Sequence, residues 1–286
     1  MAGWKSVQDR VELRNGCGIP CVGFGTWKMP QGTAGAEALH QALADGYRHI
    51  DTAAAYGNEE TVGEAVAASG IPREELFVTT KVWTTERGYD ATLRAFDESC
   101  RRLGMDYVDL YLVHWPAAQG PEGQWQRTNA ETWRALEALY AQGRARAIGV
   151  SNFKPRHLEP LMAGADVPPM VNQIEMHPGC NQEATREFCR ERGIVVEAWS
   201  PLGQGRVLAD ATLAEVAARY GCTPAQLCLR WCLQRGAIPL PKSLDAGRIS
   251  ENARIFWFDV SDEDLLLIDG LDPLGQSGLD PDTIDF

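Results

Sequence analysis

The chain has 286 residues, of which 44% are hydrophobic and 23% charged, as in an ordinary soluble protein with a sizeable core. Its formal net charge is −12, from 27 basic and 39 acidic residues, which argues against a nucleic-acid or anionic-membrane partner. No apolar run approaches the roughly 18 residues of a membrane helix. The first residues also lack the apolar stretch of a signal peptide, so we expect a cytoplasmic protein.

The first predicted element is a β-hairpin over residues 7–22, because Asn15-Gly16 is a dipeptide favoured in tight hairpin turns. Short apolar runs then alternate with amphipathic segments. The strand candidates cover 22–27, 47–52, 76–81, 107–114, 147–151, 170–175, 194–199 and 238–243. Helical spacing and helix-end signals predict helices over 58–70, 86–104, 131–143, 223–236 and 261–268. Thr223 is the expected N-cap of the fourth helix, and Gly104 and Gly236 are expected helix stops.

The eight cysteines form no CxxC pair, and nothing in the sequence indicates secretion. Cys100, for example, falls on the apolar face of a predicted helix. We therefore expect the cysteines to be small buried hydrophobic residues rather than disulfide partners.

Eight strands with helices between them predict a single (β/α)8 TIM barrel domain over residues 1–286. The hairpin precedes the barrel, and residues 270–286, rich in Gly, Pro and Asp, are expected to form an irregular tail. The competing fold is an open doubly wound sheet, which usually carries GxGxxG after its first strand. Residues 23–28 lack the third glycine of that motif and residues 203–208 also fail to match it, so the barrel is favoured.

Ionisable side chains stand at the ends of three consecutive predicted strands. Asp51 ends the second strand, Lys81 the third and His114 the fourth. Tyr56 follows Asp51 by a few residues. Each alone has an ordinary interpretation: a turn cap, a solvated lysine, a core histidine or a packing tyrosine. The active site of such barrels lies at these strand ends, and four ionisable groups are costly to bury there without mutual pairing.

Pairing of these groups suits acid catalysis. A nearby ammonium favours the phenolate and lowers the pKa of a phenol. A carboxylate beside the ammonium keeps the lysine charged and in place, and a histidine can donate a hydrogen bond to a substrate oxygen. The set would protonate an oxygen on which negative charge develops, as in the reduction of a carbonyl by hydride.

Three stretches of the sequence resemble the aldo-keto reductase family. They read GYRHIDTAAAYGNEETVGEAV, LGMDYVDLYLVHWP and LPKSLDAGRISEN, and the resemblance extends from about residue 23 to residue 252. It implies Tyr56 as the proton donor, with Lys81 and Asp51 as its tuning pair. His114 would orient the carbonyl. The family uses a nicotinamide cofactor without a Rossmann domain, in agreement with the missing glycine motif.

The same resemblance assigns a cofactor site to residues in the second half of the chain. They are Ser151, Asn152, Gln173, Trp199, Ser200, Leu202, Gln204, Lys242, Ser243, Arg248, Glu251 and Asn252. The first three would hold the carboxamide, Trp199 would stack on the nicotinamide, the next three would line the pyrophosphate path, and the last two would reach the adenine. Tryptophan at position 199 resembles the bacterial branch that includes the 2,5-diketo-D-gluconate reductases.

The cluster of Lys242, Ser243 and Arg248 also indicates a phosphate site from its residue types alone. It brings two cations and a hydroxyl together in an acidic protein, which suits the 2′-phosphate of NADP(H). An ordinary solvated loop is the alternative interpretation. We therefore expect NADPH/NADP+ as the cofactor, and no metal.

Three tryptophans, Trp27, Trp83 and Trp115, lie near the predicted strand ends. Core packing is the default for one tryptophan, but three at one rim indicate the walls of an apolar substrate pocket. Trp125, in the loop 121–127, is a further candidate. In the family that the sequence resembles, the C-terminal tail folds over the barrel mouth and helps to set specificity.

The sequence thus predicts an NADPH-dependent reductase of aldehydes and ketones, a bacterial monomer that acts on small carbonyl substrates. Two alternatives stay open. Lys81 could form a Schiff base, as in aldolases, although the basic cluster has no role in that scheme. The chain could also be an accessory protein that binds the cofactor but turns over slowly, against which the complete set of four groups speaks.

Overall fold

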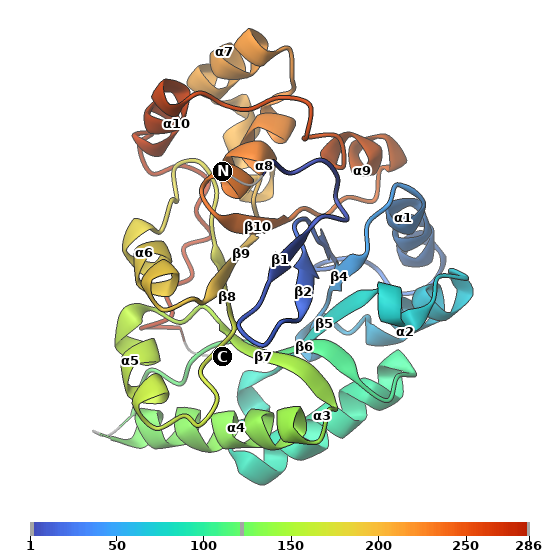
Figure 1. The fold of residues 1–286 in the computed structure, drawn as a ribbon, viewed down its shortest axis with the longest axis vertical. Coiled ribbons are helices and arrows are strands. Elements are labelled where there is room, and N and C mark those ends of the chain that lie inside the picture. The colour runs from blue at the N-terminus through green and yellow to red at the C-terminus, as the bar shows by residue number, and fades with distance from the viewer. Residues whose placement is uncertain (1–2, 121–122, 285–286) are drawn as a thin grey trace.

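The computed structural model describes residues 3–120 and 123–284 of the chain. The outermost residues of the expected domain and tail, 1–2 and 285–286, lie outside this part. Within it, eight parallel strands follow one another in sequence order around a barrel, which confirms the predicted fold (Figure 1). They are β3 (Phe24–Gly25), β4 (His49–Asp51), β5 (Phe77–Val82), β6 (Val108–Val113), β7 (Ala145–Ser151), β8 (Val171–Glu175), β9 (Val195–Trp199) and β10 (Ala237–Leu240).

Hydrogen bonds between the first and last strands close the barrel. The backbone N–H groups of Gly23 and Gly25 donate to the carbonyl oxygens of Pro239 and Pro241, each at 3.0 Å. Closure leaves β3 and β10 without a free edge, and every strand then has one face toward the barrel interior and one toward the helices. Strands β5 and β6 are accordingly buried at every residue.

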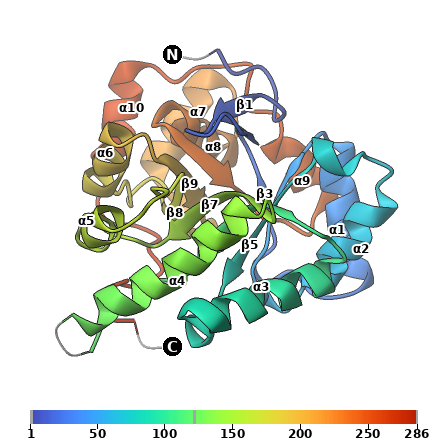
Figure 2. The same cartoon turned by 60° about the horizontal axis from the view of Figure 1, so that its bottom comes forward.

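The helices surround this ring, with α3 and α4 side by side along its outside (Figure 2). They are α1 (Thr33–Ala44), α2 (Glu59–Ala68), α3 (Tyr89–Leu103), α4 (Gln124–Ala141), α5 (Pro155–Ala163), α6 (Glu183–Glu191), α7 (Ala211–Tyr220), α8 (Pro224–Gln234), α9 (Ala246–Asn252) and α10 (Asp262–Asp269). Short 3₁₀ turns cover Ala54–Tyr56, Arg73–Glu75, Thr84–Glu86 and Gly203–Ala209. None of the helices in the described chain is long and apolar enough to cross a membrane.

Two helix ends follow the predicted signals. Gly104 ends α3 in the left-handed region, with a φ of 64°, and Thr223 caps α8 in a reciprocal capping box. Helix α4 instead begins at Gln124, two turns before its predicted start. The side chain of Asn129 fastens these extra turns, because it bonds the N–H and the carbonyl of Ala117 at 2.8 and 2.9 Å. Such a contact between distant residues leaves no mark on helical spacing.

An antiparallel hairpin of β1 (Arg10–Glu12) and β2 (Gly18–Pro20) precedes the barrel, as predicted. Gly16 takes a positive φ of 81° in its turn. The hairpin lies across the N-terminal ends of the strands (Figure 1), where the Arg10 guanidinium donates to the carbonyl of Glu75 just before β5. The C-terminal ends of the strands therefore remain open for a site.

The chain after α10 contains no helix or strand in its described residues. It runs back to the start of α5, where the Lys154 ammonium lies 2.7 Å from the carboxylates of Asp280 and Asp282. On the way, Ser277 donates from its N–H and hydroxyl to the Glu175 carboxylate at 2.7 and 2.6 Å. These contacts tie the tail across the end of β8.

The cysteines behave as the sequence predicts. All eight are free, and six of them are buried. The two others, Cys17 and Cys222, are partly buried. Burial raises the pKa of each of these two thiols, so they stay protonated at neutral pH.

The contact between α2 and α3 depends on glycine at position 63. A methyl group at Gly63 would overlap the backbone carbonyl of Leu103. We expect Gly63→Ala to lower the free energy of unfolding by about 1–3 kcal/mol, the usual cost of overpacking. Gly164→Ala is the matched control, because a Cβ there meets nothing within 4 Å and the φ of −114° suits alanine. Denaturant titrations that give both variants equal stability would contradict the contact.

Candidate active site

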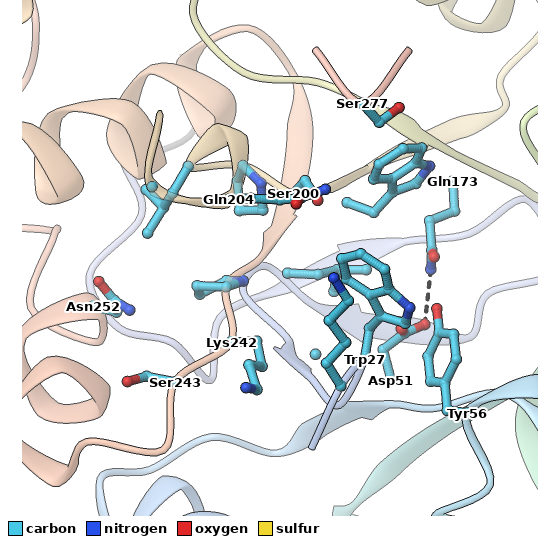
Figure 3. A pocket seen from close by; sticks show the side chains of 18 of the residues that line it. Trp27, Asp51, Tyr56, Gln173, Ser200, Gln204, Lys242, Ser243, Asn252 and Ser277 are labelled. Carbon is cyan, nitrogen blue, oxygen red and sulfur yellow. Dashed lines mark hydrogen bonds between the residues drawn. The ribbon is translucent and has the colours of Figure 1, made fainter. Parts of the chain in front are cut away.

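A cavity of about 1140 Å³ opens at the C-terminal ends of the strands. It exceeds the roughly 300–1,000 Å³ of ordinary ligand pockets, so it has room for a cofactor and a substrate together. Asp51, Tyr56 and Gln173 lie at one end of the cavity, which we name the catalytic end after the predicted catalytic residues, and Lys242 and Asn252 lie at the opposite, cationic end (Figure 3). Every residue that the sequence assigned to the cofactor lines this cavity.

Lys81 occupies the centre of the catalytic end, fully buried behind the cavity wall. Its ammonium donates to both carboxylate oxygens of Asp51 at 2.8 Å and to the carbonyl of Thr52 at 2.9 Å. The Tyr56 hydroxyl lies 3.4 Å from the same nitrogen. Asp51 ends β4, Lys81 belongs to the neighbouring β5, and the 3₁₀ turn after β4 brings Tyr56 back over the pair. The structure thus places these three predicted groups in direct contact.

The partners of Lys81 decide its charge. Burial lowers the pKa of its ammonium, but the Asp51 carboxylate and the Tyr56 phenol outweigh burial, and the pKa is raised above its ordinary value. Lys81 therefore stays an ammonium at neutral pH. A charged lysine without such partners would be strongly unfavourable at this depth.

The pKa of Tyr56 is raised in the ligand-free chain, because burial around its hydroxyl outweighs the Lys81 ammonium, which lowers it. The Asp51 carboxylate raises it further. The pKa below the ordinary value that the sequence predicts is therefore wrong for this state, since it counts the ammonium but not the loss of water. Tyr56 holds its proton at neutral pH and can donate it.

His114 follows β6 and lies beside the phenol. Its ring meets Tyr56 and Trp83 edge-on, with centroids 5.6 and 5.0 Å apart. Burial, and next the Lys81 ammonium, hold the pKa of His114 well below its ordinary value. The ring is therefore a neutral imidazole at neutral pH. Such a ring can donate one hydrogen bond to a substrate oxygen without competing with Tyr56 as an acid.

A polar chain connects His114 with the predicted carboxamide site. Asn152, in the left-handed region with a φ of 65°, donates to the His114 carbonyl at 3.0 Å. The indole N–H of Trp199 donates to the Asn152 side-chain oxygen at 2.8 Å. The Ser151 hydroxyl donates to the backbone carbonyl of Gln173 at 2.8 Å. Trp199 therefore supplies an aromatic face and also holds Asn152 in place.

The amide of Gln173 has both of its hydrogens engaged. It donates to Asp51 Oδ1 at 2.8 Å, the bond drawn in Figure 3, and to Glu197 Oε2 at 2.9 Å. Two carboxyl acceptors fix which way the amide is turned, so its oxygen is left to accept from a ligand. Glu197 had no place in the sequence analysis.

The segment after β9 carries unusual backbone angles. Ser200 and Gln204 have φ values of 48° and 57°, in the left-handed region that non-glycine residues rarely adopt. Both residues line the cavity, as does Leu202 between them. Strain of this kind gathers at ligand sites, where the fold holds it in place.

The cationic end holds Lys242, Ser243 and Arg248, and also Lys28, which the sequence analysis missed. Burial and the neighbouring Lys28 ammonium lower the pKa of Lys242, which shows that the two cations repel each other. Lys28 directly follows the first predicted strand, residues 22–27, and this position at a strand end was the available signal. The Glu251 carboxylate accepts a hydrogen bond from the hydroxyl of Thr223, the N-cap of α8, at 2.6 Å.

Comparison with known proteins agrees with this geometry. The pattern of the Aldo/keto reductase family matches residues 21–273. The chain belongs to this family. It is 47% identical over 281 residues to glyoxal reductase of Bacillus subtilis (strain 168), which covers 98% of this chain and 99% of that one.

Two solved structures are similar to this aldo/keto reductase over nearly the whole chain. The aldo/keto reductase of Brucella melitensis has a TM-score of 0.88 and 45% identity, covering 94% of this chain and 100% of that one. A Gox0644 variant in complex with NADPH has a TM-score of 0.89 and 42% identity, covering 98% and 99%.

Apolar walls stand beside the catalytic end of this aldo/keto reductase. Trp27, Trp83 and Trp115 line the cavity. Trp125 lies elsewhere: it belongs to α4, where its ring meets His157 edge-on with centroids 5.6 Å apart. Two tail residues, Ser277 and Leu279, also line the cavity and were not named from the sequence. A tail without helix or strand pattern gives no residue-level signal of its position.

The ionisation of Tyr56 in the ligand-free protein is directly measurable. We expect its phenol to ionise above the ordinary tyrosine pKa of 10, because burial outweighs the Lys81 ammonium. An ultraviolet titration of the wild type, with that of Tyr56→Phe subtracted, isolates this hydroxyl from the other tyrosines. A phenolate that forms below the ordinary value would contradict the balance of burial and charge described above.

Proposed function

We propose that this aldo/keto reductase reduces aldehydes and ketones to alcohols with NADPH, and that Tyr56 donates the proton. The observation that carries the proposal is the Lys81 ammonium, which contacts the Asp51 carboxylate and the Tyr56 hydroxyl at the base of the cavity. Membership of the family supports carbonyl reduction, and the NADPH complex of Gox0644 supports the cofactor.

The residues present fit a phosphorylated dinucleotide. Lys28 and Lys242 both line the cavity, and the Lys28 ammonium helps to lower the Lys242 pKa, so a polyanionic ligand would relieve their repulsion. At the other end, Gln173 keeps an acceptor oxygen for the carboxamide, and Trp199 offers an aromatic face. Bound NADPH would supply the hydride.

The protein groups of the catalytic end then handle the proton and the charge. Tyr56 protonates the substrate oxygen, and the Lys81 ammonium stabilises the phenolate that this leaves. Asp51 keeps the ammonium charged and in place. The neutral His114 imidazole donates a hydrogen bond to the same substrate oxygen and so directs it toward Tyr56.

The walls of the cavity favour small or aromatic carbonyl compounds. Three tryptophan rings line the cavity and would help to keep water from the reacting oxygen once a substrate is bound. The relative from Bacillus subtilis carries the name glyoxal reductase, so dicarbonyls belong in a substrate panel beside aromatic aldehydes and keto-sugars.

A Schiff-base mechanism at Lys81 is disfavoured by the geometry. Such a lysine must attack as a free amine, which requires a lowered pKa. The pKa of Lys81 is raised, and its ammonium hydrogens are directed at Asp51 and the Thr52 carbonyl. No observation favours the accessory role either.

Removal of the phenol hydroxyl tests the proton donor. Tyr56→Phe should slow carbonyl reduction by about 10²–10⁴-fold, the usual contribution of a general acid, with NADPH affinity nearly unchanged. NADPH oxidation and a fluorescence titration measure the two quantities. Tyr89→Phe, at a tyrosine that is 38% exposed, is the control and should behave as the wild type. Wild-type turnover by Tyr56→Phe would show that another group is the acid.

Loss of the cations tests the phosphate site. Lys242→Ala and Arg248→Ala should each weaken NADPH binding by about ten- to a hundredfold, as expected for one charge-assisted hydrogen bond. NADH binding should change little, since NADH lacks the 2′-phosphate. Arg127→Ala, at an exposed arginine of α4, is the control. Equal losses for the two cofactors would rule out a 2′-phosphate contact.

A further inference from the structure

A second polar layer lies in the barrel interior beneath the catalytic end. His49 of β4, Thr79 of β5 and Glu197 of β9 are each 0% exposed. His49 and Asp51 are two residues apart on β4, so they point to the same face of the strand. Glu197 is the register partner of Gln173 on the neighbouring β8. The layer is thus joined to the catalytic end through two adjacent strands.

Glu197 contacts Gln173 with one carboxyl oxygen and His49 with the other. Its Oε2 accepts from the Gln173 amide at 2.9 Å, and the same amide nitrogen donates to Asp51 at 2.8 Å. Its Oε1 lies 3.4 Å from His49 Nε2, which lies 3.2 Å from the Thr79 hydroxyl. One amide therefore spans two carboxyl groups, those of Asp51 and Glu197.

The charges of this region do not balance if both carboxyl groups are ionised. Lys81 is the cation that faces them within the described chain, and its ammonium bonds Asp51 and not Glu197. A second buried carboxylate without its own cation is costly. The cost is avoided when one proton is held by the pair of Glu197 and His49.

The surroundings place that proton on Glu197. Burial, the Lys81 ammonium and, more weakly, Arg10 of the hairpin lower the pKa of His49 to about 3. Burial and the Asp51 carboxylate raise the pKa of Glu197 to about 8, against smaller opposing effects of the Gln173 hydrogen bond and then of Lys81. The register partners of Glu197 on the two adjacent strands, Gln173 on β8 and the apolar Ile238 on β10, carry no titratable group.

We propose that Glu197 is a positioning residue for carbonyl reduction: as a protonated carboxylic acid, it fixes the Gln173 amide against Asp51 without adding a second negative charge beneath Tyr56. The inference rests on the proposed function, since its role is to serve that reaction. Glu197 does not itself line the cavity and acts through Gln173 and through the electric field at Lys81 and Tyr56.

Ionisation of Glu197 has a defined consequence. A new negative charge beside Asp51 makes the Tyr56 phenol harder to deprotonate, and a weaker acid protonates the substrate oxygen more slowly. Reduction should therefore slow as the pH rises through the ionisation of Glu197. This step comes before any loss of the Tyr56 proton, because the phenol ionises above its ordinary value of 10.

Glu197→Gln separates the proton from the shape of the side chain. The amide of the variant is neutral, can still accept from Gln173, and cannot ionise. We expect the wild-type reduction rate at neutral pH and loss of the decline near pH 8. Glu197→Ala lacks the acceptor and should raise the KM for NADPH by about three- to tenfold, with a smaller change in kcat. Glu159→Gln, at an exposed glutamate of α5, is the control for the exchange itself.

An infrared titration of the ligand-free protein tests the proton without activity. Wild type minus Glu197→Gln should show the carbonyl stretch of a protonated carboxylic acid at neutral pH, lost as the pH rises between about 7 and 9. If the variant does not fold, the wild type alone decides, because absence of any such band at neutral pH overturns the proposal. An imidazolium signal of His49 in carbon NMR at neutral pH overturns it equally.

Failure of this inference and failure of the proposed function give different results. If the wild type reduces carbonyls and Glu197→Gln keeps the decline near pH 8, the inference alone is wrong. If the wild type reduces no carbonyl, the proposed function is wrong, and the infrared band still shows whether Glu197 holds the proton.

Discussion

The buried ion pair of Lys81 and Asp51 is the interaction on which the rest of the site depends. The ammonium lies where no water can solvate it, and the Asp51 carboxylate and the Thr52 carbonyl take over that role. The pair is rigid because its members come from neighbouring parallel strands of a closed barrel. Tyr56 then has a fixed cation beside its hydroxyl. Acidity, position and charge of the catalytic end all follow from this arrangement.

The same pair sets the chemistry of its surroundings. One cation for two buried carboxyl groups leaves Glu197 to hold a proton, and burial, with the Lys81 charge second, keeps both His49 and His114 neutral. Burial and the Lys81 charge thus shift the pKa of the acids Tyr56 and Glu197 in opposite directions. They shift the pKa of the two histidines in the same direction, downward. At the far end of the cavity, the Lys28 ammonium helps to lower the pKa of Lys242, so this end favours an anionic ligand.

Much of the fold and site could be predicted because the sequence carries direct signals for them. The grouping of Asp51, Lys81 and His114 could be predicted from the sequence alone, since the C-terminal ends of all parallel strands meet at one rim of a barrel. Helices such as α5, which holds Pro160, and the seven-residue α9 gave no clear periodic pattern.

Other features depend on contacts between distant residues and could not be predicted. A glutamate inside an apolar strand, as at Glu197, gives no sign of which strand it faces. The raised pKa of Tyr56 depends on how much water the folded chain removes, which residue types do not reveal. Packing also decides where Trp125 and Leu279 lie. Trp125 belongs to α4, and the tail residue Leu279 lines the cavity.

The most direct test of the account is the rate of carbonyl-dependent NADPH oxidation by Lys81→Met, measured beside the wild type at saturating NADPH. The variant keeps the length of the side chain and removes the charge. The account predicts a rate lower by about 10²-fold or more, because the phenol loses the cation that stabilises its conjugate base. A wild-type rate in a folded Lys81→Met protein would contradict the central role of the ion pair.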